Sequence, residues 1–362
     1  METYPIPMVP GPVSVPKEVL QAYLTDFGSP DIEEEFLQMY RATAGMMQTI
    51  LGTQNEVILH TGEGMIALWG ALNSVLLPGD RVLSLSTGVF GSGICEMAQK
   101  VGAETRLVEF PFNATFGQFD VIEDAIKEFK PKMITVVHCE TPSGTLNPIA
   151  EIGALKKKYR VPLLYMDCVA SMAGAPVETD DWGVDLSLGG SQKALSAPPS
   201  MSMIAVSPVA WEIIKQVGYA GYDAFLPFAS ALQAPGNFPY TPYWQGVAVI
   251  KAAVGLILAE GLPAVFARHE QVAQYCRQRL VDMGLTLFYA DGAIASPTVT
   301  AVNVAEGWQW ADFDAALRSH GLVVGGSYGP MAGKVFRLGH MGHQARMELV
   351  QQALDVIEEV IS

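Results

Sequence analysis

The sequence predicts an α/β fold with a mostly parallel, seven-stranded sheet, followed by a smaller C-terminal α+β unit. Short β-branched runs alternate with helix-like segments through the first two-thirds of the chain. Many of these runs are nearly continuous in apolar residues, which is typical of parallel strands covered on both faces. Near Gly221 a loop rich in Pro, Gly and aromatic residues replaces this alternation. We therefore expect a large domain over residues 15–260 and a small domain over 261–362, with residues 1–14 packed against the body.

The expected elements follow the chain in this alternating order. Strands are expected over residues 56–59, 81–85, 105–109, 133–138, 162–166, 186–188 and 203–206. Helices are expected between or after them over residues 65–76, 92–101, 121–129, 149–159 and 209–217. In the last third we expect a helical stretch with a break at 261–263, strands near 298–304 and 335–338, and a closing helix over 344–361.

The composition excludes several classes of protein. The 362 residues include 22 Lys and Arg against 37 Asp and Glu, a net charge of −15. This acidic balance disfavours nucleic acid and anionic membrane surfaces as partners. Hydrophobic residues make up 50% of the chain, which excludes a disordered tail and leaves apolar surface for an oligomer interface.

The cysteines and the apolar stretches predict a cytoplasmic location. The four cysteines are scattered without a CxxC pair, and no basic and apolar leader opens the chain. The longest apolar stretch, 247–258, contains Lys251 and is shorter than the roughly 20 residues that span a bilayer. We therefore expect a reducing compartment and no membrane partner.

A glycine-containing turn follows the first predicted strand. Residues 60–67 read H-T-G-E-G-M-I-A and enter a helix, whose free N–H groups can hold a phosphate. The string also fits GxGxxA, but the next strand ends in L-S-T-G, without the carboxylate that a nicotinamide cofactor needs. A plain turn that starts a helix remains the alternative to a phosphate site.

Two ionisable residues follow later strands. Asp167 ends the strand at 162–166 and is either an N-cap or a charge placed at a site. Lys193 lies among small and apolar residues in G-G-S-Q-K-A-L-S-A-P-P. Desolvation there lowers the pKa of a lysine and makes its amine nucleophilic toward a carbonyl. A lysine that extends its ammonium to water is the alternative, but the flanking glycines and prolines favour the reactive interpretation.

A phosphate cup, a carboxylate and a reactive lysine together match the needs of pyridoxal phosphate. The lysine holds the aldehyde as a Schiff base, and the carboxylate keeps the pyridine nitrogen protonated. The freed lysine then carries a proton as general acid and base.

The sequence resembles the class V aminotransferases of fold type I, in particular the alanine–glyoxylate and serine–pyruvate branch. The most specific string is G-S-Q-K-A-L followed by P-P, over residues 190–199. Further matching strings are V-P-G-P at 9–12, H-C-E-T-P-S-G at 138–144, D-C-V-A-S at 167–171, Y-T-P at 240–242 and F-R-L-G at 336–339.

The resemblance implies which residues hold the ring of pyridoxal 5′-phosphate. Lys193 forms the Schiff base and Asp167 pairs with the ring nitrogen. Phe90 falls where the family stacks an aromatic side chain on the ring, with a core phenylalanine as the alternative. Thr141 and Ser143 line the cofactor.

The resemblance also implies the phosphate and substrate contacts. Gly64, Met65 and Gln192 fall at phosphate-binding positions. Thr241 falls where the family reaches the phosphate of the neighbouring subunit, which implies a homodimer. Arg337 falls at the residue that grips the substrate carboxylate with its bidentate fork.

Two single positions and one stretch depart from the family pattern. Glu63 stands in the phosphate loop where relatives usually carry Ser, and Trp69 replaces a common Glu in the helix that follows. The stretch F-G-S-P-D at 27–31 lacks the His-Arg pair that relatives often carry after the first helix. Because that stretch contributes to the substrate mouth in relatives, these departures leave the amino donor and acceptor open.

The sequence thus predicts an aminotransferase that moves an amino group from a small amino acid, alanine or serine, to a 2-oxo acid such as glyoxylate or pyruvate. The alternatives are a 2-aminoethylphosphonate-type transaminase, a lyase or desulfurase on the same cofactor, and a non-catalytic ligand-binding module of the same fold. A desulfurase needs a cysteine on a mobile loop, whereas Cys276 lies in a helical pattern. No metal site is predicted, because His340 and His343 have no Asp or Glu in the same turn.

Overall fold

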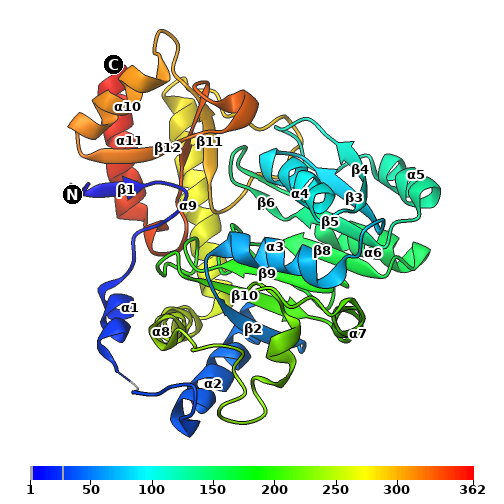
Figure 1. The fold of residues 1–362 in the computed structure, drawn as a ribbon. Helices are drawn as coiled ribbons and strands as arrows, with labels where there is room; N and C mark the ends of the chain where they lie inside the picture. Colours follow the sequence, from blue (N-terminus) through cyan, green and yellow to red (C-terminus); the bar gives the residue numbers. More distant parts are fainter. Residues whose placement is uncertain (1–2, 27) are drawn as a thin grey trace.

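A seven-stranded sheet forms the centre of the molecule, in a computed structural model that describes residues 3–26 and 28–362 (Figure 1). Its strands are β2 (Glu56–Thr61), β3 (Arg81–Ser86), β4 (Glu104–Glu109), β5 (Met133–Val137), β8 (Leu163–Asp167), β9 (Leu186–Gly190) and β10 (Met201–Val206), in the order β2-β10-β9-β8-β5-β3-β4. The strands from β4 to β9 pair in parallel, and β10 runs antiparallel to both β9 and β2. The predicted fold class, a mostly parallel sheet, is confirmed.

Helices cover both faces of this sheet, so its central strands are buried along their whole length and mostly apolar. Every residue of β5, β8, β9 and β10 is buried. Val136 points into one core, against α2 (Glu34–Ile50), α5 (Phe119–Phe129), α6 (Ile149–Tyr159) and α8 (Trp244–Glu260), and its neighbour Val137 points into the other, against α3 (Gly64–Val75), α4 (Val89–Lys100) and α7 (Pro208–Val217). Burial of alternate side chains in two cores is the physical reason for the continuous apolar runs.

A four-stranded sheet forms the second unit, at the upper left of Figure 1. Its order is β1 (Ile6–Met8), β12 (Leu322–Gly326), β13 (Val335–Leu338) and β11 (Thr300–Asn303). The helices α9 (Leu262–Asp282), α10 (Trp310–Ser319) and α11 (Met347–Ile361) share its core. Because β1 pairs in parallel with β12, the N-terminal strand belongs to the C-terminal sheet. Residues 1 and 2 of the predicted N-terminal segment, and residue 27 of the stretch at 27–31, lie outside the described residues.

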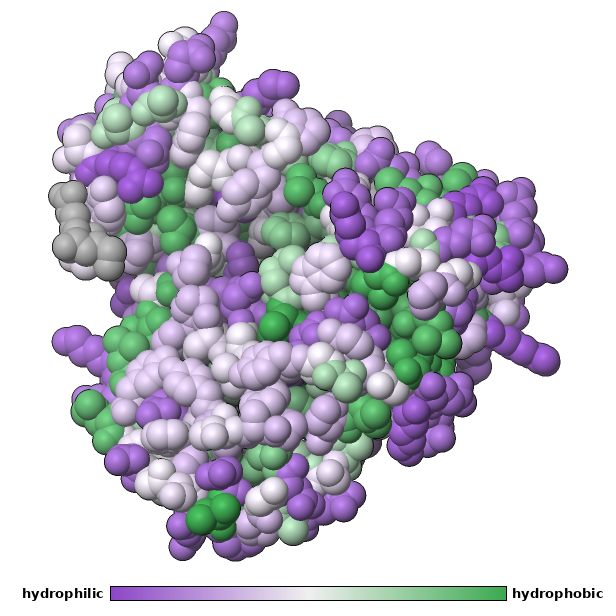
Figure 2. All heavy atoms as spheres, viewed as in Figure 1, coloured by the Kyte–Doolittle hydropathy of each residue, from purple (hydrophilic) through white to green (hydrophobic). Residues whose placement is uncertain are grey.

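The remaining elements are short. They are α1 (Lys17–Gln21), the hairpin of β6 (Cys139–Glu140) and β7 (Thr145–Leu146), and the 3-10 turns η1 (Ala22–Leu24), η2 (Leu226–Ser230), η3 (Gly329–Met331) and η4 (Gly342–Gln344). Hydrophilic side chains are dense around α5 in the space-filling view (Figure 2).

Most predicted elements are present, with ends that shift by up to a few residues. The bounds of α6 and β13 are those predicted, and the predicted break in the long helical stretch lies at Gly261, between α8 and α9. The prediction contains no element for α2, β1, α10 or β12. Within the described part of the chain no single helix is long and apolar enough to cross a bilayer, although α8 and α9 together, bent by 85°, meet that test by length and composition.

Candidate active site

A pocket lies where the carboxyl ends of the large-sheet strands meet the starts of the helices that follow them. Its lining residues are Glu63, Gly64, Met65, Leu68, Phe90, Cys139, Thr141, Asp167, Val169, Ala170, Gln192 and Lys193. They come from the ends of β2, β3, β5, β8 and β9 and the segments after them, as expected for a ligand site in an open α/β sheet. The structure thus brings together seven of the predicted site residues: Gly64, Met65, Phe90, Thr141, Asp167, Gln192 and Lys193.

Lys193 lies on a tightly bonded loop between β9 and β10. Ser191 Oγ donates to Pro198 O at 2.5 Å and accepts from Met201 N at 3.1 Å, which closes the loop on itself. The Nζ of Lys193 donates to the carbonyl of Pro10. Burial and then the positive charge of Arg337 lower the pKa of Lys193 to about 8, although the negative charge of Asp167 opposes this change. A substantial share of the amine is therefore neutral near pH 8 and available as a nucleophile.

The N-terminal segment packs directly on this lysine. Gly11 has a φ of +98°, and a Cβ there would lie 2.5 Å from Cδ and 2.7 Å from Nζ of Lys193. Only glycine permits both this backbone conformation and this approach. The glycine of the P-G-P string at 10–12 is therefore needed for close packing against Lys193.

Asp167 both caps a turn and faces the pocket. Its Oδ1 accepts from Val169 N at 2.9 Å, and the side chain is 6% exposed. Burial raises its pKa to about 6, partly offset by the Val169 N–H and the charge of Lys193. No helix follows β8 in the described residues before β9, so Asp167 caps a turn and not a helix, and it also lines the pocket; its role at a site stays a prediction.

Glu140 is a site residue that sequence reasoning missed. It is fully buried, its Oε1 accepts from Gly91 N at 2.8 Å, and its Oε2 accepts from Phe90 N at 3.3 Å. Burial raises its pKa to about 7. A Cβ on Gly88 would lie 2.5 Å from its Cδ, so the T-G-V-F-G string is the signal that a buried group approaches this turn. Glu140 fixes the start of α4 and with it the backbone of Phe90.

Arg337 reaches the neighbourhood of the pocket from the small sheet. It lies on β13 with 3% exposure, its Nε donates to Gly326 O at 2.8 Å, and its guanidinium lies 4.8 Å from the ring centre of Tyr328. Gly325 makes room for it, because a Cβ there would lie 3.4 Å from Nη2 of Arg337 and 2.6 Å from Cδ of Pro10. Gly325 thus lies against both the Arg337 guanidinium and the ring of Pro10, the residue whose carbonyl binds Lys193.

Three predicted site residues do not line the pocket of this chain: Arg337, Ser143 and Thr241. Ser143 lies in the turn between β6 and β7, where its hydroxyl bonds with Thr145 Oγ1 at 2.9 Å. Thr241 is exposed in the loop before α8. A role for Thr241 therefore requires a second subunit and stays a prediction. Trp69, one of the departures from the family pattern, is half-buried against the α3 face of the core.

Glu63 immediately precedes α3 and turns toward Gln192. Its Oε2 accepts from Gln192 Nε2 at 2.8 Å. Gln192 is 8% exposed, and in the described chain no donor reaches its buried Oε1. The carboxylate is therefore held at the α3 end of the pocket.

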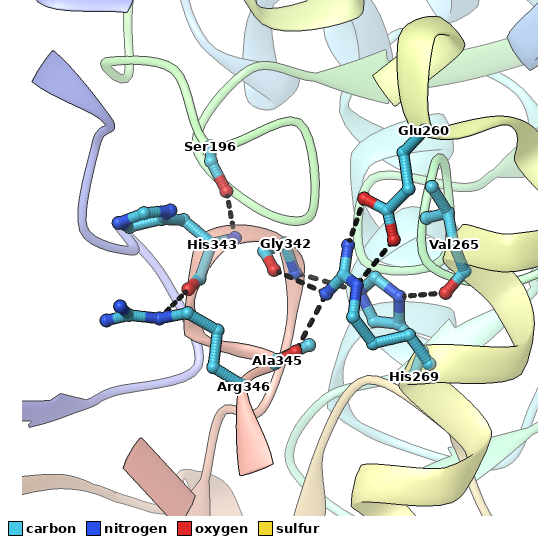
Figure 3. Close-up of polar contacts among 9 residues, drawn as sticks. Ser196, Glu260, Val265, His269, Gly342, His343, Ala345 and Arg346 are labelled. Atoms are coloured by element: carbon cyan, nitrogen blue, oxygen red, sulfur yellow. Dashed lines mark hydrogen bonds and ion pairs between the residues drawn. The ribbon is translucent and has the colours of Figure 1, made fainter. Parts of the chain in front are cut away.

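The loop of Lys193 is also fixed to the small domain (Figure 3). Ser196, which has a φ of +55°, accepts the His343 N–H on its Oγ at 2.7 Å. A Cβ on Gly342 would lie 2.1 Å from the same Oγ. The segment that carries the lysine is thus bonded to η4 of the small domain.

Arg268 and His269, near the start of α9, both bond to Gly342 of η4, and Figure 3 shows His269 beside this turn. Arg268 pairs with Glu260 through Nε–Oε1 and Nη2–Oε2 distances of 2.6 and 2.9 Å, and its Nη1 donates to Ala345 O at 2.8 Å. His269 Nε2 accepts from Gly342 N at 2.9 Å. Burial lowers the pKa of His269 to about 4, so its ring is neutral and free to accept this bond.

Cys276 and His340, the residues considered for desulfurase and metal chemistry, are buried in the core. Cys276 on α9 is fully buried, and burial raises the pKa of its thiol to about 12, so it is not the exposed nucleophile that a desulfurase needs. His340 is buried with its Nε2 2.7 Å from Thr300 Oγ1. Among residues 3–26 and 28–362 no group of three or more His, Cys, Asp and Glu side chains is placed to hold a metal ion.

Comparison with known proteins identifies the family. The class-V aminotransferase family model matches residues 12–348. The chain is 32% identical to the alanine–glyoxylate aminotransferase of Oryctolagus cuniculus, over 97% of this chain and 91% of that protein. It is 32% identical to the pyridoxamine–pyruvate transaminase of Mesorhizobium japonicum, over 94% of this chain and 87% of that protein.

A solved structure agrees over the whole chain. The crystal structure of an alanine–glyoxylate aminotransferase from Nostoc sp. superposes with a TM-score of 0.94 at 28% identity, covering 100% of this chain and 96% of that one. The resemblance predicted from the lysine motif is confirmed. The chain belongs to the class-V aminotransferases, a family of fold type I enzymes that typically use pyridoxal 5′-phosphate.

Proposed function

We propose that this protein transfers an amino group between a small amino acid, such as alanine or serine, and a 2-oxo acid such as glyoxylate or pyruvate. One observation carries the proposal: a lysine whose pKa is lowered to about 8 shares a pocket with the buried Asp167, beside Arg337. The relatives named for transfer to glyoxylate or pyruvate support this choice of acceptor.

The ring end of the pocket fits a pyridoxal group. Lys193 supplies an amine for the aldehyde, Asp167 supplies a buried negative charge for the pyridine nitrogen, and Phe90 supplies an aromatic side chain at the pocket wall. When bound, a protonated pyridine ring withdraws electrons from the carbon atoms between which the amino group and a proton move. The negative charge of Asp167 favours the protonated ring nitrogen.

Lys193 has two tasks in this proposal. Its neutral amine would hold the aldehyde of the bound group covalently, and its Nζ would take up and release a proton beside the 2-carbon of the substrate. The Pro10 carbonyl accepts a hydrogen bond from Nζ and orients the amine. An amine with a pKa near the working pH suits both the gain and the loss of that proton.

Arg337 orients the substrate. Its Nε and Nη2 are bound to the Gly326 carbonyl and its plane lies over Tyr328, so the guanidinium is held before a ligand arrives. A guanidinium binds a carboxylate through parallel N–H bonds and places the 2-carbon of the substrate.

We also propose that the active unit is a homodimer in which Thr241 reaches the α3 end of the neighbour's pocket. Support comes from Thr241 being exposed in its own chain, and from exposed apolar side chains at Met65 and Tyr222. Analytical ultracentrifugation and mixing of Lys193→Ala with Thr241→Ala subunits test this proposal. Partial activity restored on mixing two inactive variants supports shared sites, and a monomeric active enzyme contradicts them.

A donor and acceptor panel tests the proposed reaction. Alanine and serine are paired with glyoxylate and pyruvate, and product amino acids are measured by chromatography. We expect turnover with the wild type, none with Lys193→Ala, and with Arg337→Gln a raised KM for carboxylate substrates. Lys251→Ala, a change of the same kind at an exposed site on α8, serves as the control. A wild type that captures no pyridoxal compound on Lys193 would contradict the proposal.

A further inference from the structure

The α3 end of the pocket presents hydrogen-bond acceptors. Glu63 Oε2 takes the Nε2–H of Gln192 at 2.8 Å, which assigns the amide orientation. This leaves Gln192 Oε1 buried and, within the described residues, without a donor. A Cβ on Gly190 would lie 2.8 Å from that oxygen and 3.1 Å from Gly64 N. One corner of the pocket therefore holds, close together, the Glu63 carboxylate, the unpaired Oε1 of Gln192 and the start of α3.

The ionisable side chain at this corner is an acid, Glu63. Among the described residues that line the pocket, Lys193 is the cation, and Glu63 and Asp167 are the two acids. Burial is the main reason that the pKa of Asp167 is raised, and the charge of Glu63 adds to it. The negative charge of Glu63 thus acts on Asp167, another residue that lines the pocket.

A phosphate ester fits this corner poorly. Near neutral pH it carries between about −1.5 and −2 charges and its oxygens are acceptors. The first amides of α3 could donate to it, but Glu63 would repel it and Gln192 Oε1 would stay unpaired. A hydroxyl group fits both kinds of partner, because it donates to a carboxylate or amide oxygen and accepts from a backbone N–H.

We propose that this pocket takes the pyridoxal ring in its unphosphorylated form, with the hydroxymethyl group against Glu63 and Gln192. The inference rests on the proposed function, since it assumes capture of the ring aldehyde by Lys193. It makes pyridoxamine and pyridoxal exchangeable substrates of the site, with pyruvate or glyoxylate as the partner.

The exchange balances without an added oxidant or reductant. The amino group and one hydrogen leave the aminomethyl carbon of pyridoxamine, which is oxidised to the aldehyde. The 2-carbon of the oxo acid is reduced and gains the C–N and C–H bonds of the amino acid. Its carbonyl oxygen leaves as water, and a water supplies the aldehyde oxygen of pyridoxal. Lys193 moves the proton between the two carbons.

Binding without turnover tests the inference. Full-length protein freed of any bound pyridoxal compound is titrated with pyridoxal and with pyridoxal 5′-phosphate, each followed by its visible absorption. Borohydride reduction and peptide mass spectrometry then locate the adduct on Lys193. We expect a Kd for pyridoxal about tenfold or more below that for the phosphate, the scale of one charge–charge contact at a partly buried site.

Charge variants at Glu63 give the matched comparison. Glu63→Ser removes the charge and adds a donor, and Glu63→Gln removes the charge at constant size. Both should shift the preference toward the phosphate form by about tenfold or more, by the same electrostatic argument. Glu104→Gln removes a charge at an exposed position on β4 and should leave the preference unchanged.

The outcomes separate this inference from the proposed function. Wild-type protein that binds the phosphate form as tightly as pyridoxal, or a preference that Glu63→Ser does not move, overturns the inference and leaves amino transfer intact. Capture of neither compound on Lys193 overturns the proposed function itself. Equimolar pyridoxal and alanine from pyridoxamine and pyruvate supports both.

Discussion

At the scale of single residues, the chemistry depends on how burial and charge balance at Lys193. The ammonium is partly withdrawn from water and lies near the positive charge of Arg337, and both effects disfavour the protonated form. Asp167 and Glu63 oppose them without cancelling them. The amine is thus poised between its two protonation states close to physiological pH.

We expect the rate of aldehyde capture by Lys193 to rise with pH through about 8 and to level off above it. For an ordinary lysine, with a pKa near 10.5, the capture rate would rise at a pH about two units higher. Stopped-flow absorption with pyridoxal from pH 6 to 10 measures the midpoint. Arg337→Gln removes the positive neighbour and should move the midpoint upward. A midpoint near 10.5 in the wild type would contradict the prediction.

At the scale of elements, the site is held by the starts of helices and by the N-terminal segment. Glu140 fixes the first amides of α4 and thereby Phe90, and Gly11 allows residues 9–12 to close on Lys193. Local sequence pattern does not show which group either residue contacts, because the partner in each case lies about 50 or more residues away.

Glu140→Gln should destabilise the protein by about 1–3 kcal/mol. One of the two carboxylate oxygens becomes an NH2 group, which faces an N–H of α4 and leaves that buried donor unpaired. The free energy of unfolding from urea titration measures the loss. Glu104→Gln, an exposed change of the same chemistry, should differ from wild type by less than about 0.5 kcal/mol. Equal stability of the two variants would argue against the capping role.

Gly11→Ala should impair aldehyde capture by Lys193. The new Cβ would lie 2.5 Å from Cδ of that lysine at a φ of +98°, so the amine or the segment must move. Gly28→Ala is the matched control, because Gly28 also has a positive φ, +69°, but has open space around it. Both variants share the backbone cost of about 1 kcal/mol, and only Gly11→Ala should slow the capture measured by absorption. Equal capture rates in the two would contradict the contact.

At the scale of the whole molecule, buried histidines link stability to pH. Burial lowers the pKa values of His138, His269 and His340 to about 3, 4 and 3, from an ordinary value of 6.5. They stay neutral in the folded state while the unfolded chain binds their protons. Their contribution to stability is therefore complete above about pH 6.5 and is lost as pH falls toward 3–4. Glu140 and Asp167, with raised pKa values, act in the opposite direction between about pH 4 and 7.

We expect His340→Gln to flatten the acid side of the stability profile. Removing one neutral histidine removes about one proton from the difference between unfolded and folded states, or about 1.4 kcal/mol per pH unit. Urea titrations at intervals between pH 4 and 6.5 measure the slope. The loss of the bond to Thr300 Oγ1 lowers stability at every pH and leaves the slope comparison valid. A slope equal to that of the wild type would contradict the assignment of a neutral ring.

The central sheet and the ring end of the site are predictable from the sequence because their signals are local. Lys193 and Asp167 stand among apolar neighbours just beyond apolar strands, and charge in such a place is rare without a function. The helix α2 was missed although Phe36, Tyr40, Thr43 and Met47 recur at helical spacing on its buried face, because polar residues interrupt the apolar pattern. Glu140, Pro10 and the pairing of β1 depend on tertiary contacts that no local pattern contains.

The pairing of β1 with β12 has a consequence for how the chain matures as it leaves the ribosome. Residues 6–8 are synthesised some 315 residues before their strand partner, and the carbonyl of Pro10, two residues after this strand, binds Lys193 in the folded chain. At translation speeds of about 5–20 residues per second, β1 therefore remains without its partner while the roughly 315 residues up to β12 are made. A nascent chain arrested before residue 322 should therefore lack the closure over its lysine, and a bulky fusion ahead of β1 would delay the same late step.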